Sequence, residues 1–157
     1  MALIAYFYLL GQESDQLLNF SAFGHVQGTI VAVSVKLLVV DDDAGSLAAL
    51  ADILSMEEYL VETVANGQEA LDHLRAADVL PALIILDLFM PVMDGWQFLA
   101  ELKTDAKLSQ FRIPVIVVTA LNARVDADAV IRKPIDLVRL IQTVASLLRT
   151  TPGDAMT

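Results

Sequence analysis

The sequence contains no cysteine, which excludes disulfide bonds, thiolate metal sites and cysteine nucleophiles. Basic residues are also scarce, because 10 Lys and Arg stand against 20 Asp and Glu and leave a net charge of −10. An acidic chain without a basic patch argues against a nucleic-acid partner, since nonspecific binding neutralises phosphates with Lys and Arg. Although 56% of the residues are hydrophobic, no uninterrupted apolar stretch approaches the ~20 residues of a membrane-spanning helix. We therefore expect a soluble, cytoplasmic protein without a membrane partner.

The first 34 residues differ from the remainder of the 157-residue chain. They contain no Lys or Arg, and Glu13 and Asp15 are their only acids. Residues 1–10 are apolar but lack the positive flank and the cleavage pattern of a signal peptide. We interpret residues 1–34 as a loosely ordered N-terminal extension, with an added strand over 29–35 or a self-association segment as the alternative.

Residues 35–149 form the predicted domain, and residues 150–157 a flexible tail. Within the domain, short apolar runs alternate with segments of helical composition. Apolar runs between turn signals are typical of strands buried on both faces, and strands that alternate with helices predict a parallel α/β sheet. The predicted strands are 36–40, 60–64, 82–86, 115–118 and 129–132, and the predicted helices are 44–56, 68–76, 95–103 and 136–148.

Polar side chains gather where the predicted strands end. Because the carboxyl ends of parallel strands lie on one edge of the sheet, residues far apart in sequence converge there. If the first and third strands are neighbours, Asp42 and Asp87 face one crevice. The residues at this edge are Asp41, Asp42 and Asp43 after the first strand, Asp87 after the third, Thr119 after the fourth and Lys133 after the fifth.

This combination of side chains predicts phosphoryl chemistry. Several carboxylates in one site repel each other unless a cation neutralises them, and oxygen ligands with room for water suit Mg²⁺. A carboxylate beside Mg²⁺ can act as a nucleophile toward a phosphoryl group and form an aspartyl phosphate. A Lys ammonium and a Thr hydroxyl can stabilise the oxygens of that group. The residues therefore predict phosphoryl transfer onto Asp87.

Four motifs contain these strand-end residues, and they are, in chain order, Val39-Val40-Asp41-Asp42-Asp43, Leu86-Asp87-Leu88-Phe89-Met90-Pro91 followed by Met93-Asp94-Gly95, Val118-Thr119-Ala120, and Arg132-Lys133-Pro134. In this order the motifs resemble those of the response-regulator receiver domain of two-component signalling, over about residues 36–148. The resemblance implies a single doubly wound, flavodoxin-like sheet of five parallel strands in the order 2-1-3-4-5.

The resemblance also implies the roles of individual residues. Mg²⁺ would be bound by Asp42, Asp87 and the backbone carbonyl of Phe89, with Asp41 assisting. Asp87 would be the phosphoacceptor. A histidine kinase or histidine phosphotransfer protein would donate the phosphoryl group, and the output would be contact with a downstream protein target.

Further along the chain, the resemblance assigns Thr119 and Lys133 to the phosphoryl oxygens and implies a cis peptide bond before Pro134. Apolar groups at Phe89 and Leu121, each two residues beyond a site residue, predict slow autodephosphorylation because they impede an attacking water.

The chain departs from the family pattern in two places. The connection between the fourth and fifth strands, residues 120–128, is only nine residues long, whereas a parallel crossover normally needs a dozen or more. We therefore expect the fourth helix to be short or missing. Val130 stands where the family commonly has Tyr or Phe, the aromatic that reports movement of the Thr. We expect a domain that accepts phosphate but signals weakly or unconventionally.

Other polar and aromatic residues have simpler interpretations. Asp43 and Asp94 are expected to cap the helices that follow them. His73 is expected to be an ordinary surface or half-buried residue. Trp96 and Phe98 are expected to pack rather than to recognise a ligand.

The predicted helix 44–56 carries one charge, Asp52, and apolar residues on more than one face. One stripe packs on the sheet. The remainder is expected either to dock a helix of the phosphodonor, as in the family it resembles, or to be covered by the N-terminal extension.

Two alternatives to a phosphoacceptor remain open. One is a pseudo-receiver scaffold with impaired switching. The other is a haloacid-dehalogenase-like phosphatase, which the Asp41-x-Asp43 pair loosely mimics, although only Asp136 and Asp154 follow Lys133 as candidate metal ligands. Nothing after residue 150 suits a further output domain. We therefore expect a single receiver domain that is not an enzyme beyond its own phosphorylation and dephosphorylation.

Overall fold

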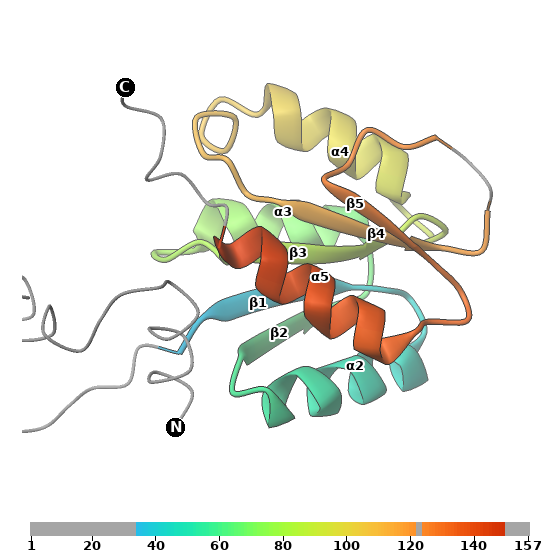
Figure 1. The fold of residues 1–157 in the computed structure, drawn as a ribbon. Coiled ribbons are helices and arrows are strands. Elements are labelled where there is room, and N and C mark those ends of the chain that lie inside the picture. Colours follow the sequence, from blue (N-terminus) through green and yellow to red (C-terminus); the bar gives the residue numbers. More distant parts are fainter. Residues whose placement is uncertain (1–33, 122–123, 150–157) are drawn as a thin grey trace, which may run out of the picture. The chain divides into compact units, whose positions relative to one another are not determined.

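The computed structural model describes residues 34–121 and 124–149, so the predicted N-terminal extension and C-terminal tail lie outside the described residues. The core is one sheet of five parallel strands in the order β2-β1-β3-β4-β5 (Figure 1). This confirms the predicted sheet and its order. The strands are β1 (Lys36–Val40), β2 (Leu60–Val64), β3 (Leu83–Asp87), β4 (Val115–Thr119) and β5 (Ala129–Arg132).

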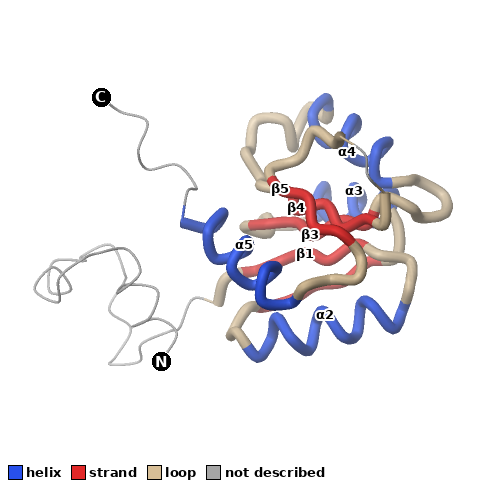
Figure 2. The backbone as a smooth tube through the Cα atoms, turned by 45° about the vertical axis from the view of Figure 1, so that its right-hand side comes forward, coloured by secondary structure: helices blue, strands red, loops and turns tan. Residues whose placement is uncertain are grey.

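Helices cover both faces of the sheet, which makes the fold doubly wound (Figure 2). One face packs against α3 (Gly67–Ala76) and α4 (Gly95–Thr104), and the opposite face against α2 (Ala44–Met56) and α5 (Leu137–Arg149). Among the described residues, no helix combines the length and the apolar character needed to cross a membrane.

The apolar runs become strands because both of their faces are covered. Alternate residues of β1 enter different cores: Leu38 and Val40 face α3 and α4, whereas Leu37 and Val39 face α2 and α5. All residues of β3 and β4 are buried, whereas the edge strands β2 and β5 are partly exposed. The central strands are therefore apolar throughout and carry their polar residues at their ends.

Side-chain caps fix where the helices begin. The Asp43 carboxylate accepts a 2.7 Å hydrogen bond from the Ser46 amide at the start of α2. Asp94 begins α4 with a capping box, in which the Gln97 amide donates to Asp94 and the Asp94 amide donates to the Gln97 side chain. The interpretation of Asp43 and Asp94 as caps is confirmed. Along α2, Leu50 and Leu54 are the residues buried against the sheet.

The connection from β4 to β5 contains no helix among its described residues, 120–121 and 124–128. It is held by side chains instead. Val125 and Ala127 pack against the core under α3 and α4. Asp128 Oδ2 accepts a 2.8 Å hydrogen bond from the Val115 amide, and Asp126 forms an ion pair with Lys103. The prediction of a short or missing fourth helix is confirmed.

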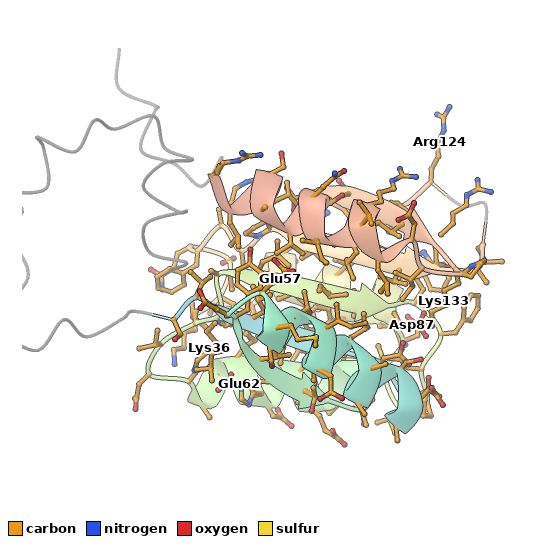
Figure 3. All side chains as sticks on the ribbon, turned by 60° about the horizontal axis from the view of Figure 1, so that its bottom comes forward. Lys36, Glu57, Glu62, Asp87, Arg124 and Lys133 are labelled. Atoms are coloured by element: carbon orange, nitrogen blue, oxygen red, sulfur yellow. The ribbon has the colours of Figure 1, made fainter. Side chains whose placement is uncertain are left out.

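Two smaller predictions concern single positions. The peptide bond between Lys133 and Pro134 is cis, as expected. His73 is half-buried, and its Nε2 lies 2.7 Å from Glu62 Oε2, while Lys36 Nζ lies 3.0 Å from the other carboxylate oxygen. His73 is therefore part of a local ion-pair group. Lys36 and Glu62 lie at the end of the sheet opposite Asp87 (Figure 3).

Candidate functional site

The carboxyl edge of the sheet collects the predicted site residues. Asp87 is the last residue of β3 and Thr119 the last residue of β4, while Asp41 follows β1 directly. Lys133 follows β5, and Figure 3 shows it beside Asp87. Parallel pairing of β1 with β3 and of β3 with β4 brings these strand ends together.

Three carboxylates form an acidic cluster at this edge. Asp41, Asp42 and Asp87 each offer one oxygen, and the three oxygens lie within 4.8 Å of one another. Asp41 and Asp87 are buried, with 3% and 6% of their surface exposed, whereas Asp42 is exposed. The Asp43 amide donates a 2.9 Å hydrogen bond to Asp41 Oδ1, which orients that carboxylate. The Asp43 side chain turns to cap α2 instead.

Lys133 connects two members of the cluster. Its Nζ lies 3.2 Å from Asp41 Oδ2 and 3.3 Å from Asp87 Oδ1. The Lys133 amide donates a 2.9 Å hydrogen bond to the Thr119 carbonyl, which fixes the backbone from which the side chain starts. One ammonium thus faces a cluster of carboxylates and leaves an excess of negative charge.

Burial and neighbouring charges shift the pKa values of Asp87 and Lys133. Burial raises the pKa of the Asp87 carboxyl above its ordinary value, and Asp41 acts in the same direction against the opposing effect of Lys133. Burial alone would lower the pKa of Lys133, but the neighbouring Asp87 and Asp41 carboxylates outweigh it and raise that pKa. The lysine therefore remains a firmly charged partner in the site.

Thr119 lies fully buried at the same edge. Its Oγ1 accepts a 3.1 Å hydrogen bond from the Leu121 amide, which holds the side chain in one orientation. The hydroxyl hydrogen can still donate to another acceptor.

Two glycines allow the loop after β3 to pack closely against neighbouring parts of the chain. A Cβ on Gly95 would lie 2.6 Å from the Asp87 carbonyl oxygen, and a Cβ on Gly67 would lie 2.8 Å from Met93 Cγ. The Gly67 amide donates to the Met93 carbonyl at 3.0 Å, and the Gly95 amide donates to the Leu88 carbonyl at the same distance. In the sequence, the Asn66-Gly67 and Asp94-Gly95 pairs indicate turns at these two positions. They do not indicate that the backbone packs so closely there.

Two aromatic side chains stand on the same loop and helix start. Phe89 is 52% exposed and Trp96 37% exposed. Their ring centroids are 5.4 Å apart with an interplanar angle of 81°, an edge-to-face contact. Phe98 packs in the core, as expected, whereas Trp96 packs against Phe89 at the surface. The contact of Trp96 with Phe89 was not predicted from the sequence.

The donor set fits a divalent cation. Oxygen ligands of one Mg²⁺ lie at most about 4.2 Å apart, twice the usual bond length, so small rotations would bring these three carboxylates into range. Oxygen ligands and uncompensated negative charge are what Mg²⁺ requires.

A parallel sheet of order 2-1-3-4-5 with acids and a lysine at its carboxyl edge is the arrangement of a receiver-type, flavodoxin-like domain. The model of the response regulator receiver domain matches residues 37–145, and the chain belongs to this family. Within the family, Asp41, Asp42 and Asp87 form the type of acidic cluster that holds Mg²⁺.

Several curated proteins that are similar to this chain are response regulators. The chain is 39% identical over 125 residues to the response regulator PleD of Caulobacter vibrioides, covering 74% of this chain and 27% of that protein. It is 35% identical over 127 residues to the response regulator Rre1 of Synechocystis, covering 75% and 53%. The chain thus spans between about a quarter and a half of the length of these curated relatives.

Solved structures show the same fold. One is the receiver domain of a signal transduction histidine kinase from Syntrophus aciditrophicus, with a TM-score of 0.68 and 34% identity over 79% of this chain and 98% of that one. Another is the phosphorylated cyanobacterial phytochrome response regulator RcpA, with a TM-score of 0.61 and 29% identity over 79% and 98%.

Proposed function

We propose that the domain is a phosphoacceptor of a two-component phosphorelay, in which Asp87 takes a phosphoryl group from a histidine kinase or a histidine phosphotransfer protein. The observation that carries this proposal is the contact of Lys133 with both Asp41 and Asp87 inside the acidic cluster. A receiver domain implies a cognate histidine kinase. The output is contact with a downstream protein target.

The transfer step requires a nucleophile with a path to phosphorus. An Asp87 carboxylate oxygen forms a bond to the phosphorus as the bond between phosphorus and the donor's imidazole nitrogen breaks, and the imidazole keeps the electron pair. The product is an aspartyl phosphate. The position of Asp87 at the end of β3, on the carboxyl edge of the sheet, supports this role.

The neighbouring side chains stabilise the transferred group. The Lys133 ammonium, now shared by two carboxylates, moves to a phosphoryl oxygen when Asp87 becomes phosphorylated. The Thr119 hydroxyl, held by the Leu121 amide, donates its hydrogen to a second phosphoryl oxygen. Asp41, Asp42, Asp87 and the Phe89 carbonyl would hold Mg²⁺, which when bound supplies positive charge to the carboxylates and the phosphoryl oxygens.

Phosphorylation by a small-molecule donor tests the proposal. The wild type and the variants Asp87→Asn and Asp43→Asn are incubated with Mg²⁺ and acetyl phosphate or phosphoramidate, and the intact mass is recorded. Asp43→Asn is the matched control, because Asn caps α2 equally well and Asp43 lies beside the cluster without joining it. We expect one phosphoryl group on the wild type and on Asp43→Asn, and none on Asp87→Asn.

The other outcomes separate the alternatives. No uptake by the wild type would favour a pseudo-receiver scaffold. Continued turnover of the phosphodonor by Asp87→Asn would point to a phosphatase.

A further inference from the structure

The Phe89 side chain does not join the core that its neighbours enter. Leu86, Leu88 and Met90 all lie in the core beneath α3 and α4, whereas Asp87 and Phe89, which alternate with them, are not part of that core. Phe89 is 52% exposed. An exposed aromatic ring therefore stands two residues after Asp87.

Trp96 contacts the Phe89 ring and lies in the fixed first turn of α4. It is the second residue of α4, whose first turn is fixed by the Asp94 capping box and by the hydrogen bond from the Gly95 amide to the Leu88 carbonyl. From this base the indole meets the Phe89 ring edge-to-face at 5.4 Å. Packing alone accounts poorly for the pair, because both rings keep a large exposed surface. Their contact instead fixes where the Phe89 ring stands.

We infer that Trp96 is a positioning residue, which holds the Phe89 ring beside Asp87 and so slows hydrolysis of the aspartyl phosphate. In that hydrolysis a water oxygen bonds to phosphorus, the bond from phosphorus to the Asp87 oxygen breaks, and the carboxylate keeps the electron pair. The water proton passes to solvent and inorganic phosphate leaves. An apolar ring beside the phosphoryl group lowers the chance that a water is aligned for this attack. The inference rests on the proposed function of Asp87.

A double-mutant cycle tests whether Trp96 acts through Phe89. The variants Trp96→Ala, Phe89→Ala and the double substitution are phosphorylated with phosphoramidate and Mg²⁺, the donor is removed, and the half-life of the phosphorylated protein is followed by mass. We expect Trp96→Ala to shorten the half-life roughly two- to tenfold, the factor that corresponds to one edge-to-face pair. In the Phe89→Ala background, the same substitution should change nothing.

Two further variants separate positioning from general destabilisation. Trp96→Phe keeps an aromatic edge and should retain the long half-life, whereas Trp96→Leu keeps only the apolar bulk and should not. Phe111→Ala is the matched control, because Phe111 is 50% exposed but precedes the amino end of β4, at the opposite edge of the sheet. Its half-life should equal that of the wild type, and thermal unfolding verifies that each variant is folded.

The result can fail in two distinguishable ways. Equal acceleration by Trp96→Ala in both backgrounds, or none in either, would overturn the inference while leaving Asp87 as the phosphoacceptor. A wild type that takes up no phosphoryl group would contradict the proposed function and, with it, this inference.

Discussion

Val92 is a single residue in an unfavourable backbone conformation. Its φ is 68°, in the left-handed region that β-branched residues rarely adopt. The Met93 amide donates to the Pro91 carbonyl at 2.8 Å, which closes a tight γ-turn around Val92. The side chain is 82% exposed, so it gains no packing in return. This strain lies on the loop that follows β3 and Asp87.

Replacing Val92 with glycine should therefore stabilise the domain. Removing the Cβ relieves about 1–2 kcal/mol of strain, and the greater freedom of glycine in the unfolded chain offsets part of it. We expect Val92→Gly to raise the free energy of unfolding by roughly 0.5–1 kcal/mol, measured by urea denaturation. Val79→Gly is the control, because Val79 is also exposed but has no positive φ. That variant should lose stability, and a loss at Val92 as well would refute the argument.

At the scale of single residues, the sequence was sufficient to predict which residues meet at the ends of the strands. Asp41, Asp87 and Lys133 meet because apolar runs define the strands, and parallel strands end on one edge. The contact of Phe89 with Trp96 was beyond prediction. It depends on the angle at which α4 leaves the loop, and residue type and spacing do not determine that angle.

At the scale of elements, the connection between β4 and β5 replaces a helix with a few fixed contacts. Asp128 and Val115 hold each other in both directions: the Asp128 amide donates to the Val115 carbonyl at 3.0 Å, and the Val115 amide donates to Asp128 Oδ2 at 2.8 Å. Arg112 Nη2 also lies 2.5 Å from the other oxygen of Asp128. These contacts start the pairing of β5 with β4.

Truncating Asp128 should loosen this connection. Asp128→Ala leaves the amide of the buried residue Val115 without its acceptor, and we expect a loss of about 1–3 kcal/mol of unfolding free energy in urea titrations. Asp128→Asn keeps an acceptor oxygen and should lose less. The control is Asp126→Ala, whose ion pair with Lys103 is solvent-exposed and should contribute little to the free energy of unfolding. Similar losses for Asp126→Ala and Asp128→Ala would argue against a specific role for the Val115 hydrogen bond.

The segment after α4 should respond to pH through Asp105. One Asp105 oxygen accepts from Arg75 Nε at 2.8 Å, and the other accepts from the Lys107 and Leu108 amides at 2.9 and 3.0 Å. The Arg75 hydrogen bond and then these amides lower the pKa of Asp105. Because the folded pKa lies below the unfolded one, the ionised group contributes stability above about pH 4, and this contribution is lost as the pH falls further.

Asp105→Asn should therefore reduce stability at pH 6 and approach the wild type below about pH 4. Urea titrations of both proteins across this range measure the difference. Asp72→Asn is the matched control, since Asp72 lies 3.6 Å from the same guanidinium but is largely exposed, and it should show little difference at any pH. A deficit for Asp105→Asn that stays constant into acid would exclude the ionised carboxylate as its source.

The order and type of the elements were predictable, including the missing helix, because nine residues between two parallel strands leave too little chain for a full crossover helix. The exact bounds of the strands were less predictable, since β3 extends through Asp87, one residue beyond the end of the predicted strand. The way the short connection is held could not be predicted, because Asp128 bonds to a residue 13 positions earlier, across the strand pair.

At the scale of the whole molecule, the acidic cluster has the side chains expected of its family, whereas the β4–β5 region departs from the family pattern. The acidic cluster and Lys133 are assembled at the sheet edge. In contrast, Val130 on β5 is an aliphatic residue packed against the core under α3 and α4, and the connection that precedes it is tied to Lys103 and Val115. We therefore expect only a small movement of this region to follow from a change at the site.

A phosphoryl analogue should therefore bind with little rearrangement of this region. We expect beryllofluoride with Mg²⁺ to raise the thermal unfolding temperature, because a ligand that binds only the folded state stabilises it. Amide hydrogen exchange should slow around Asp87 and change little over 119–121 and 124–133. Asp87→Asn, treated identically, should show neither effect. A large change in exchange over 124–133 in the wild type would contradict the prediction, because it would mean that contacts such as Asp128 to Val115 yield when the site is filled.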